Sequence, residues 1–441
     1  MNRELILATL AVAVACVWPR PAAAEAGARR SSACNGPLDA DIVVGCALAA
    51  SPEVRSARAA LDATSGRLTT AGSWLPSNPT LAAVVSNRRR PPPESASVLN
   101  WSVALSQELE IAGQRGARMD AVAAETAVHA RRVGVAEQEV AAGALAAYYE
   151  AVAAQEALRF AAALAETART LAELADGRAK EALLAGVEAA VARAEATRIG
   201  LARVEAERRY ADSSAALAVL LDRDPRGLTV PAVLTVPPTD VPASEPPASE
   251  PLEDQALRLR GEVAAAAMER QVLERRLALV RRERVPNPTL SAFAERGEID
   301  DRILGIGLSV PLPLPAPVGR ARAGEIAETL AQIRAAEASQ DLVRRRVRLE
   351  VARAQAALKA RQGGAALFTG ELLTRARTHL SSLRDAIAAR QISLREALQW
   401  QRTFIELLQA DIEVRLGSAL AWVELRRVAG LPLTAMQQGA P

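Results

Sequence analysis

Two stretches of the chain alternate apolar residues with small or polar ones. The apolar positions are Leu99, Trp101, Val103 and Leu105 in residues 98–109, and Leu304, Ile306, Leu308 and Val310 in residues 302–312. Successive side chains of a β-strand point to opposite faces, so a period of two predicts a strand with one apolar face. A shorter stretch of β character precedes each one, at residues 80–87 and 289–296. The pattern therefore predicts two β-hairpins.

Long helical stretches surround both hairpins. Residues 114–182 contain no Pro and are rich in Ala, Glu and Arg, which predicts a helix of about 100 Å at 1.5 Å per residue. A break near Gly186 turns this helix back. The expected helices are residues 45–75, 114–182 and 188–221 in the first half of the chain, and residues 252–285, 319–390 and 393–429 in the second half.

The tetrapeptide Asn-Pro-Thr-Leu directly precedes both hairpins, at residues 78–81 and 287–290. Pro cannot continue a helix and favours extended backbone before it, so each copy ends a helix and opens a strand. A turn with Gly and Arg follows each hairpin, in residues 108–118 and 314–324, where Gly lets the backbone pass from strand to helix. The repeated order predicts an internal duplication.

The duplication suggests five segments along the chain. These are a signal peptide (residues 1–24), a first repeat (25–221), a Pro-rich linker or equatorial segment (222–251), a second repeat (252–430) and a C-terminal tail (431–441). Each repeat is expected to contain a helix, a β-hairpin and a long helical hairpin.

Composition agrees with long, closely packed helices. Only 3% of the 441 residues are aromatic, and small apolar residues are interleaved with Arg and Glu, which is typical of coiled coils. The 54 basic and 51 acidic residues nearly balance, and few aromatic residues are present to stack on bases, so nucleic acid is not an expected partner.

The N-terminal residues predict export. An apolar run from Leu5 to Val17 is followed by small residues, which is typical of a secretory signal and too short for a membrane span. An alternative is that Cys16 is lipidated and becomes the mature N-terminus. Cys34 and Cys46 then remain in an oxidising compartment, where a local disulfide is expected.

The chain shows little sign of catalytic chemistry. The two His residues, His129 and His379, each stand alone in helical stretches, so they are expected on helix surfaces or in packing rather than as metal ligands. No nucleophile–base pair, phosphate loop or metal cluster stands out in the sequence. We therefore expect no enzyme activity, no cofactor and no metal site.

Four strands with an apolar face are too few to close a barrel, and open strand edges cannot face lipid. Three copies would supply twelve strands, within the range of outer-membrane barrels, and would gather the long helices into a hollow cylinder. In such a barrel the eight alternating apolar residues of the two hairpins would face lipid.

The chain resembles a known family in several stretches. These are the two copies of Asn-Pro-Thr-Leu, "LSQELEIAGQRGAR" at residues 105–118, "GIGLSVPLPLPAPVGRARA" at 305–323, and "QISLREALQWQRTFIELLQADIEVRLGSALAWVELRRVAGLPL" at 391–433. Their order and duplication are similar to those of the outer-membrane efflux protein (TolC-like) family. The form of residues 107–115 is similar to members that serve heavy-metal exporters of the resistance-nodulation-division type.

The resemblance implies a fold that is mainly α with a small β part. A homotrimer would form a trimeric outer-membrane β-barrel, with four strands per chain, and a coiled-coil helical barrel that extends into the periplasm of a Gram-negative bacterium. It further implies an exit duct that receives substrates from an inner-membrane pump through a periplasmic adaptor. An alternative class is a periplasmic coiled-coil adaptor or scaffold, although neither needs a tandem repeat with apolar strand faces.

The resemblance also suggests where the pore narrows. Family members commonly carry acidic residues just after the turn between the last two long helices, which here are residues 319–390 and 393–429. Glu396 matches that position. The next acidic position of the family is Gln399 here, and its usual turn Gly is Arg390. Glu188, at the first turn, is a further candidate. The alternative for Glu396 is a solvated helix charge paired with a nearby Arg.

Overall fold

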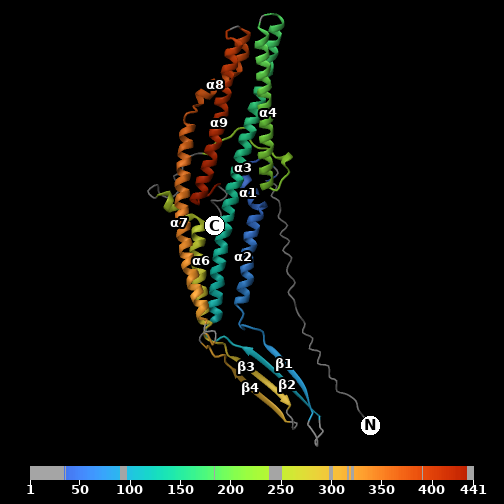
Figure 1. Cartoon of the computed structure of the whole chain (residues 1–441), viewed down its shortest axis with the longest axis vertical. Helices are drawn as coiled ribbons and strands as arrows, with labels where there is room; N and C mark the ends of the chain where they lie inside the picture. Colours follow the sequence, from blue (N-terminus) through green and yellow to red (C-terminus); the bar gives the residue numbers. More distant parts are fainter. Residues whose placement is uncertain are drawn as a thin grey trace, which may run out of the picture.

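The computed structural model describes residues 34, 36–89, 97–182, 184–237, 251–296, 301–314, 317–318, 322–389 and 391–434. Long helices form an elongated body, and a small sheet continues it at one end (Figure 1). The two helical turns lie at the opposite end of the body (Figure 1). Cys16, the expected signal segment and Arg390 lie outside the described residues.

The same order of elements occurs twice. The first half contains α1 (Ala40–Ala50), α2 (Pro52–Ala71), β1 (Thr80–Arg89), β2 (Ser97–Glu108), α3 (Gln114–Lys180) and α4 (Gly186–Leu220). The second half contains α5 (Leu252–Leu259), α6 (Gly261–Arg282), β3 (Thr289–Arg296), β4 (Arg302–Ser309), α7 (Ala323–Ala365), α8 (Gly370–Ala388) and α9 (Leu394–Ala429). Helix α3, with 67 residues, is about 100 Å long.

The helix expected before each hairpin is two helices rather than one. The first break comes at Ser51, whose Oγ accepts a hydrogen bond from Val54 N at 3.2 Å, and Pro52 opens α2. Pro is favoured at the first helical position because the missing N–H has no intrahelical partner there. The second break comes at Arg260, before Gly261 opens α6. The two breaks occupy the same place in both halves.

The prediction of one continuous rod over residues 319–390 was wrong. Helix α7 ends at Ala365 and α8 begins at Gly370. Gly363 and Gly364 weaken the end of α7, since each Gly costs about 1 kcal/mol relative to Ala in a helix. Thr369 Oγ1 then accepts a hydrogen bond from Leu372 N at 3.2 Å and starts a new helix. The counterpart in the first half, α3, is unbroken.

The turns from strand to rod differ between the halves. Gly113 precedes α3 with φ 71°, in the left-handed region that glycine adopts without strain. In the second half Arg322 holds a left-handed position, with φ 54°, whereas Gly319 of the predicted turn lies outside the described residues. Arg322 is held by Glu283 at 2.9 Å and Glu325 at 2.7 Å. Ion pairs with both neighbours therefore offset the backbone cost.

The four strands form one antiparallel sheet in the order β1-β2-β3-β4. The two hairpins join through the pairing of β2 with β3, so β1 and β4 are the two edges. Strand β4 was expected to reach residue 312 but ends at Ser309, which leaves Val310 just outside it. Pro311 and Pro313 follow and have no N–H to donate to a ladder.

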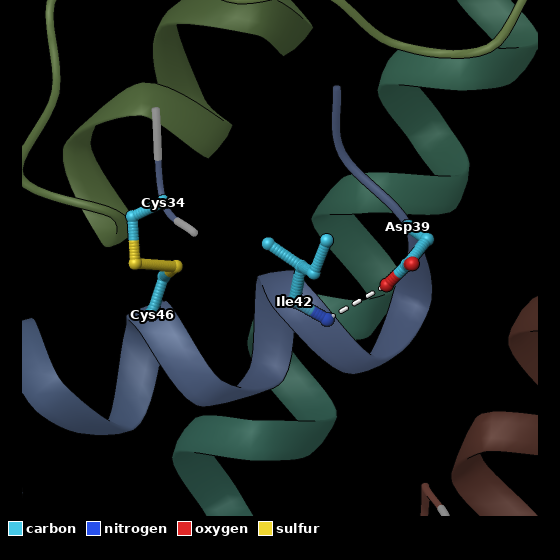
Figure 2. Close-up of a disulfide and its surroundings, with 4 residues drawn as sticks. All are labelled: Cys34, Asp39, Ile42 and Cys46. Carbon is cyan, nitrogen blue, oxygen red and sulfur yellow. Dashed lines mark hydrogen bonds between the residues drawn. A yellow bond between two sulfur atoms is a disulfide. The ribbon is translucent and has the colours of Figure 1, made fainter. Parts of the chain in front are cut away.

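A hydrophobic core lies at the middle of the body, where α1 packs against α3. Leu228 and Leu234, from the Pro-rich segment after α4, are buried in the same core. Figure 2 shows the disulfide that joins Cys34 to Cys46 of α1, with Cα atoms 5.9 Å apart. The N-terminal segment is thereby tied to the core.

Candidate functional sites in the sheet and at the helical tip

The strand register brings the apolar positions of both hairpins to one face of the sheet. Leu105 of β2 pairs with Ala292 of β3, and Ala292 pairs with Ile306 of β4. Cross-strand partners share a face, so Leu99, Trp101, Val103 and Leu105 lie on the same face as Leu304, Ile306 and Leu308. This face is exposed in the single chain: Leu304 and Ile306 are each 84% exposed.

The first strand of each hairpin extends this face, which the sequence analysis did not include. Leu81 pairs with Leu105 and Val85 pairs with Trp101, and Leu290 pairs with Leu308. Leu81 and Val85 are 69% and 68% exposed. The alternation of Leu81, Ala83 and Val85 could have indicated this from the sequence. We use the name apolar sheet face for the surface formed by Leu81, Val85 and Leu290 together with the seven apolar residues of β2 and β4.

The opposite face of the sheet carries mostly small or polar residues, with Val84, Phe293 and Ile303 among the exceptions. Ser102, Ser106 and Ser291 occupy it, and Ser291 Oγ donates a hydrogen bond to Gly307 O at 3.2 Å. The Phe293 ring lies over Gly305, which leaves no room for a Cβ there. The sheet is therefore amphipathic: large apolar side chains dominate one face, and small or hydroxyl-bearing side chains dominate the other.

The second Asn-Pro-Thr-Leu motif connects the sheet to the rods. Asn287 Nδ2 donates to Glu108 Oε1 at 2.8 Å, and Asn287 Oδ1 accepts from Gln114 Nε2 at 2.9 Å. Gln114 is only 2% exposed, and its Oε1 accepts from Ala112 N at 2.8 Å. This network fixes the end of β2 and the start of α3 against the strand entry of the second half.

The turn between α3 and α4 and the turn between α8 and α9 lie together at one end of the body, which we call the tip (Figure 1). A groove of about 400 Å³ opens there between the first turns of α4 and those of α9. It is lined by Val187, Glu188, Val191, Arg395, Leu398, Gln399 and Arg402. The structure thus brings two sequence candidates, Glu188 and Gln399, to one groove, whereas Glu396 is not among its lining residues.

Glu396 is exposed and takes part in the N-terminal cap of α9. Its Oε2 accepts hydrogen bonds from Ser393 N at 2.9 Å and Ser393 Oγ at 2.7 Å, and Ser393 Oγ accepts from Glu396 N. These bonds hold the pKa of Glu396 below its ordinary value. Among the described residues its hydrogen-bond partner is Ser393, so the carboxylate has a structural role at the start of α9.

A buried carboxylate connects the two helical hairpins near the tip. Glu195 of α4 is 4% exposed, and its Oε2 accepts from Arg402 of α9 at 2.8 Å. Arg198, one turn along α4, donates to Glu195 Oε1 at 2.6 Å. Hydrogen bonds from Arg198 and then Arg402 lower the pKa of Glu195 to about 2. We name Glu195 and Arg402 the tip ion pair; sequence reasoning missed it, because pairing of charges on distant helices leaves no local pattern.

A second network connects the hairpins at mid-height. Arg415 of α9 donates to Glu156 of α3 at 2.7 Å and to Asp411 at 3.0 Å. Leu234 N donates to Glu156 Oε2 at 2.7 Å, and Leu234 O accepts from Arg415 at 2.9 Å. Burial raises the pKa of Glu156, but the Arg415 and Leu234 hydrogen bonds outweigh it, and the pKa lies below its ordinary value. The network anchors the Pro-rich segment between α3 and α9.

The described residues show neither a metal-ligand cluster nor a membrane-spanning helix. No group of three or more potential metal ligands occurs among them. His129 is half-buried in α3, and His379 is exposed and stacks on Phe404 with ring centroids 6.0 Å apart. None of the helices searched in this part of the chain is both long and apolar enough to cross a membrane.

Repeated hairpins, one amphipathic sheet and two long helical hairpins define the TolC-like fold of outer-membrane channels. The structure of CusC, described for its transmembrane channel formation, matches with a TM-score of 0.74 and 13% identity over 89% of this chain and 92% of that one. The outer-membrane channel OprN matches with a TM-score of 0.71, 18% identity, and 89% and 90% coverage.

The outer membrane protein VceC from Vibrio cholerae has the same fold. It matches with a TM-score of 0.70 and 17% identity, over 90% of this chain and 97% of that chain. No family model matches the sequence, and no curated protein matches it. The likeness therefore establishes the fold over nearly the whole chain, in agreement with the fold class predicted from the sequence.

Proposed function

We propose that this chain is one subunit of an outer-membrane exit duct in a tripartite efflux or secretion system. The observation that carries the proposal is the apolar sheet face, exposed at one end of a helical body about 100 Å long. Hydrocarbon exposed to this extent in a folded chain indicates contact with lipid or with another protein. The fold shared with outer-membrane channels favours lipid.

The two free edges of the sheet support a homotrimer. Strands β1 and β4 lie on opposite sides of the sheet (Figure 1), so β4 of one copy can pair with β1 of the next. Head-to-tail contacts of this kind close into a ring when the rotation permits. Three copies give twelve strands, an even number within the range of outer-membrane barrels, with the serine-bearing face toward the lumen.

The groove at the tip supports docking of a periplasmic adaptor and, through it, an inner-membrane pump. Val187 is 75% exposed and Val191 is 50% exposed beside Arg395. Exposed apolar side chains beside an Arg suit a protein partner. We place Glu396, Glu188 and Gln399 near the narrow periplasmic end of the duct, where three copies of each side chain would approach the axis.

Passage through such a duct needs no catalysis by this chain. The pump would supply the energy and select the cargo. Export of heavy metals remains a prediction, based on the likeness of residues 107–115 to one branch of the family. Lipidation of Cys16 also remains a prediction; acyl mass on the mature chain would support it.

A periplasmic adaptor or a coiled-coil scaffold is the alternative proposal. Neither accounts for the apolar sheet face, because a protein in water gains nothing from exposing Leu304, Ile306 and Leu308 on one surface. Nor does an adaptor need two tandem repeats. The sheet thus favours the duct.

Fractionation of cells that make the full-length protein tests the proposal. A trimer that is found in outer membranes and dissociates on heating is expected, with ion conduction after reconstitution in planar bilayers. Recovery of the protein in the soluble periplasmic fraction would exclude the duct and favour the scaffold.

A further inference from the structure

Gln401 lies in the apolar stripe of α9 near the tip. Its side chain is 0% exposed. Ala397, one turn before it, and Ile405, one turn after it, are buried in an apolar cluster with Leu171 of α3 and Leu380 of α8. Residues four apart share one face of a helix, so Gln401 occupies a position where the pattern calls for an apolar side chain.

The amide of Gln401 has no hydrogen-bond partner among the described residues. Both Nε2 and Oε1 are buried and unpaired, so exchanging the two atoms changes nothing. Gln114, buried to a similar extent at the sheet junction, has partners for both of its amide atoms. Buried amides in this chain can therefore be satisfied, and the one at the tip is not.

No partner molecule can reach Gln401 in the described packing. The side chain is fully enclosed within a single chain, so neither a second copy nor an adaptor can bond to it while the helices stay in place. A buried polar group without a partner disfavours the state that buries it. Only a shift of α9 away from its neighbours would let water or another polar group bind the amide.

The next residue has the opposite effect. Arg402 donates to Glu195 of α4 at 2.8 Å and favours the packed position of α9. We infer that the unpaired amide of Gln401 narrows the free-energy gap between two packings of the first turns of α9: one held by the tip ion pair and the apolar cluster, and a displaced one with Gln401 hydrated. A smaller gap raises the population of the displaced packing.

Gln401 thus acts as a built-in destabiliser that sets how readily the tip opens. The link to opening rests on the proposed duct function, whereas the two packings of α9 do not. A partner that favours the displaced packing then needs a smaller difference in affinity to shift the equilibrium.

Hydrogen exchange of the purified full-length protein tests the inference. Gln401→Leu and the closer-sized Gln401→Met remove the unpaired amide, so amides in the first half of α9 should exchange about 10-fold more slowly, since exchange follows the population of the opened state. Gln409→Leu and Gln409→Met, on the exposed side of the same helix and away from the tip groove, are the matched controls. Their exchange should equal that of the wild type.

Unchanged or faster exchange in both Gln401 variants would overturn the inference. Conduction in planar bilayers is a separate readout. Slower exchange with reduced opening supports both the two packings and the duct. Slower exchange in a protein that never conducts supports the two packings and counts against the duct alone.

Discussion

Arg402 of α9 and Glu195 of α4 are joined across the two helical hairpins at 2.8 Å, although more than two hundred residues separate them in the sequence. Near the tip, α4 and α9 otherwise face each other across the groove. We predict that Arg402→Met loosens this end of the molecule only modestly, because Arg402 is exposed and Arg198 still pairs with Glu195. The expected result is faster hydrogen exchange in the first turns of α4 and α9.

Arg198→Met is the matched control for this prediction. It removes the other guanidinium from the same carboxylate but keeps the contact between α4 and α9. Equal loosening in both variants would mean that the charge of Glu195 needs neutralising and that the link between hairpins is unimportant.

The pH dependence of the same contact follows from the lowered pKa of Glu195, about 2. A carboxyl group whose folded pKa is depressed contributes stability above its unfolded pKa, near 4.3, and loses it as pH falls toward the folded value. The tip should therefore loosen between about pH 4.5 and pH 2. Glu195→Gln should flatten this dependence in exchange measured over that range; an equally steep loss in the variant would assign it to other carboxylates.

Leu308→Arg should destabilise the inserted protein by about 2 to 4 kcal/mol if Leu308 lies near the bilayer midplane. The yield of heat-modifiable trimer in outer membranes measures this. Ser309→Arg is the control, because the adjacent residue of β4 lies on the opposite face and should tolerate the charge. Equal yields from both variants would contradict lipid contact at the apolar sheet face.

Gly113→Ala should cost about 1 to 2 kcal/mol from the left-handed backbone alone. A Cβ at this position would also lie 2.5 Å from Arg282 Nη1, whose hydrogen bond to Gly113 O spans 2.9 Å. Thermal unfolding measures the loss. Gly116→Ala is the control: a Cβ there meets nothing within 4 Å, and within α3 the change should stabilise slightly.

Glu396 has two possible contributions that separate by substitution. Glu396→Ala removes the charge and the Glu396 half of the capping box, while the Ser393 cap remains, so it should weaken the start of α9 slightly. Glu396→Gln keeps a capping side chain and removes only the charge. If the carboxylate faces the pore, both variants reduce cation preference in planar bilayers, and Glu396→Lys reverses it. Wild-type selectivity in all three would leave Glu396 with its capping role only.

The sequence was most informative where one residue pattern decides the local structure. Alternation predicted the strands within a few residues, and the absence of Pro predicted the full extent of α3. Two features escaped because weaker local preferences were settled by their surroundings. The helix break at 366–369 depends on Gly363 and Gly364 in an otherwise helical stretch. Arg322 adopts a left-handed backbone only with Glu283 and Glu325 beside it.

The candidate site was predictable in part. The alternation of apolar and polar residues predicted which residues of β2 and β4 lie on the apolar sheet face. The register that puts both hairpins on one face could be seen only from the pairing of β2 with β3. Gln401 reads as an ordinary helix residue in the sequence. It stands out only because no described residue around it accepts a hydrogen bond from its amide or donates one to it. Contacts between distant helices cannot be predicted from local composition.

The meeting of Glu195 with Arg402 also limits how such a chain can evolve in length. Farther from the tip, Arg415 of α9 pairs with Glu156 of α3. This contact fixes the position of one helical hairpin along the other. One extra helical turn in α3 and α4 alone would carry Glu195 about 5.4 Å past Arg402. A lineage can therefore become longer or shorter only by paired insertions or deletions, one in each half of the duplicated chain.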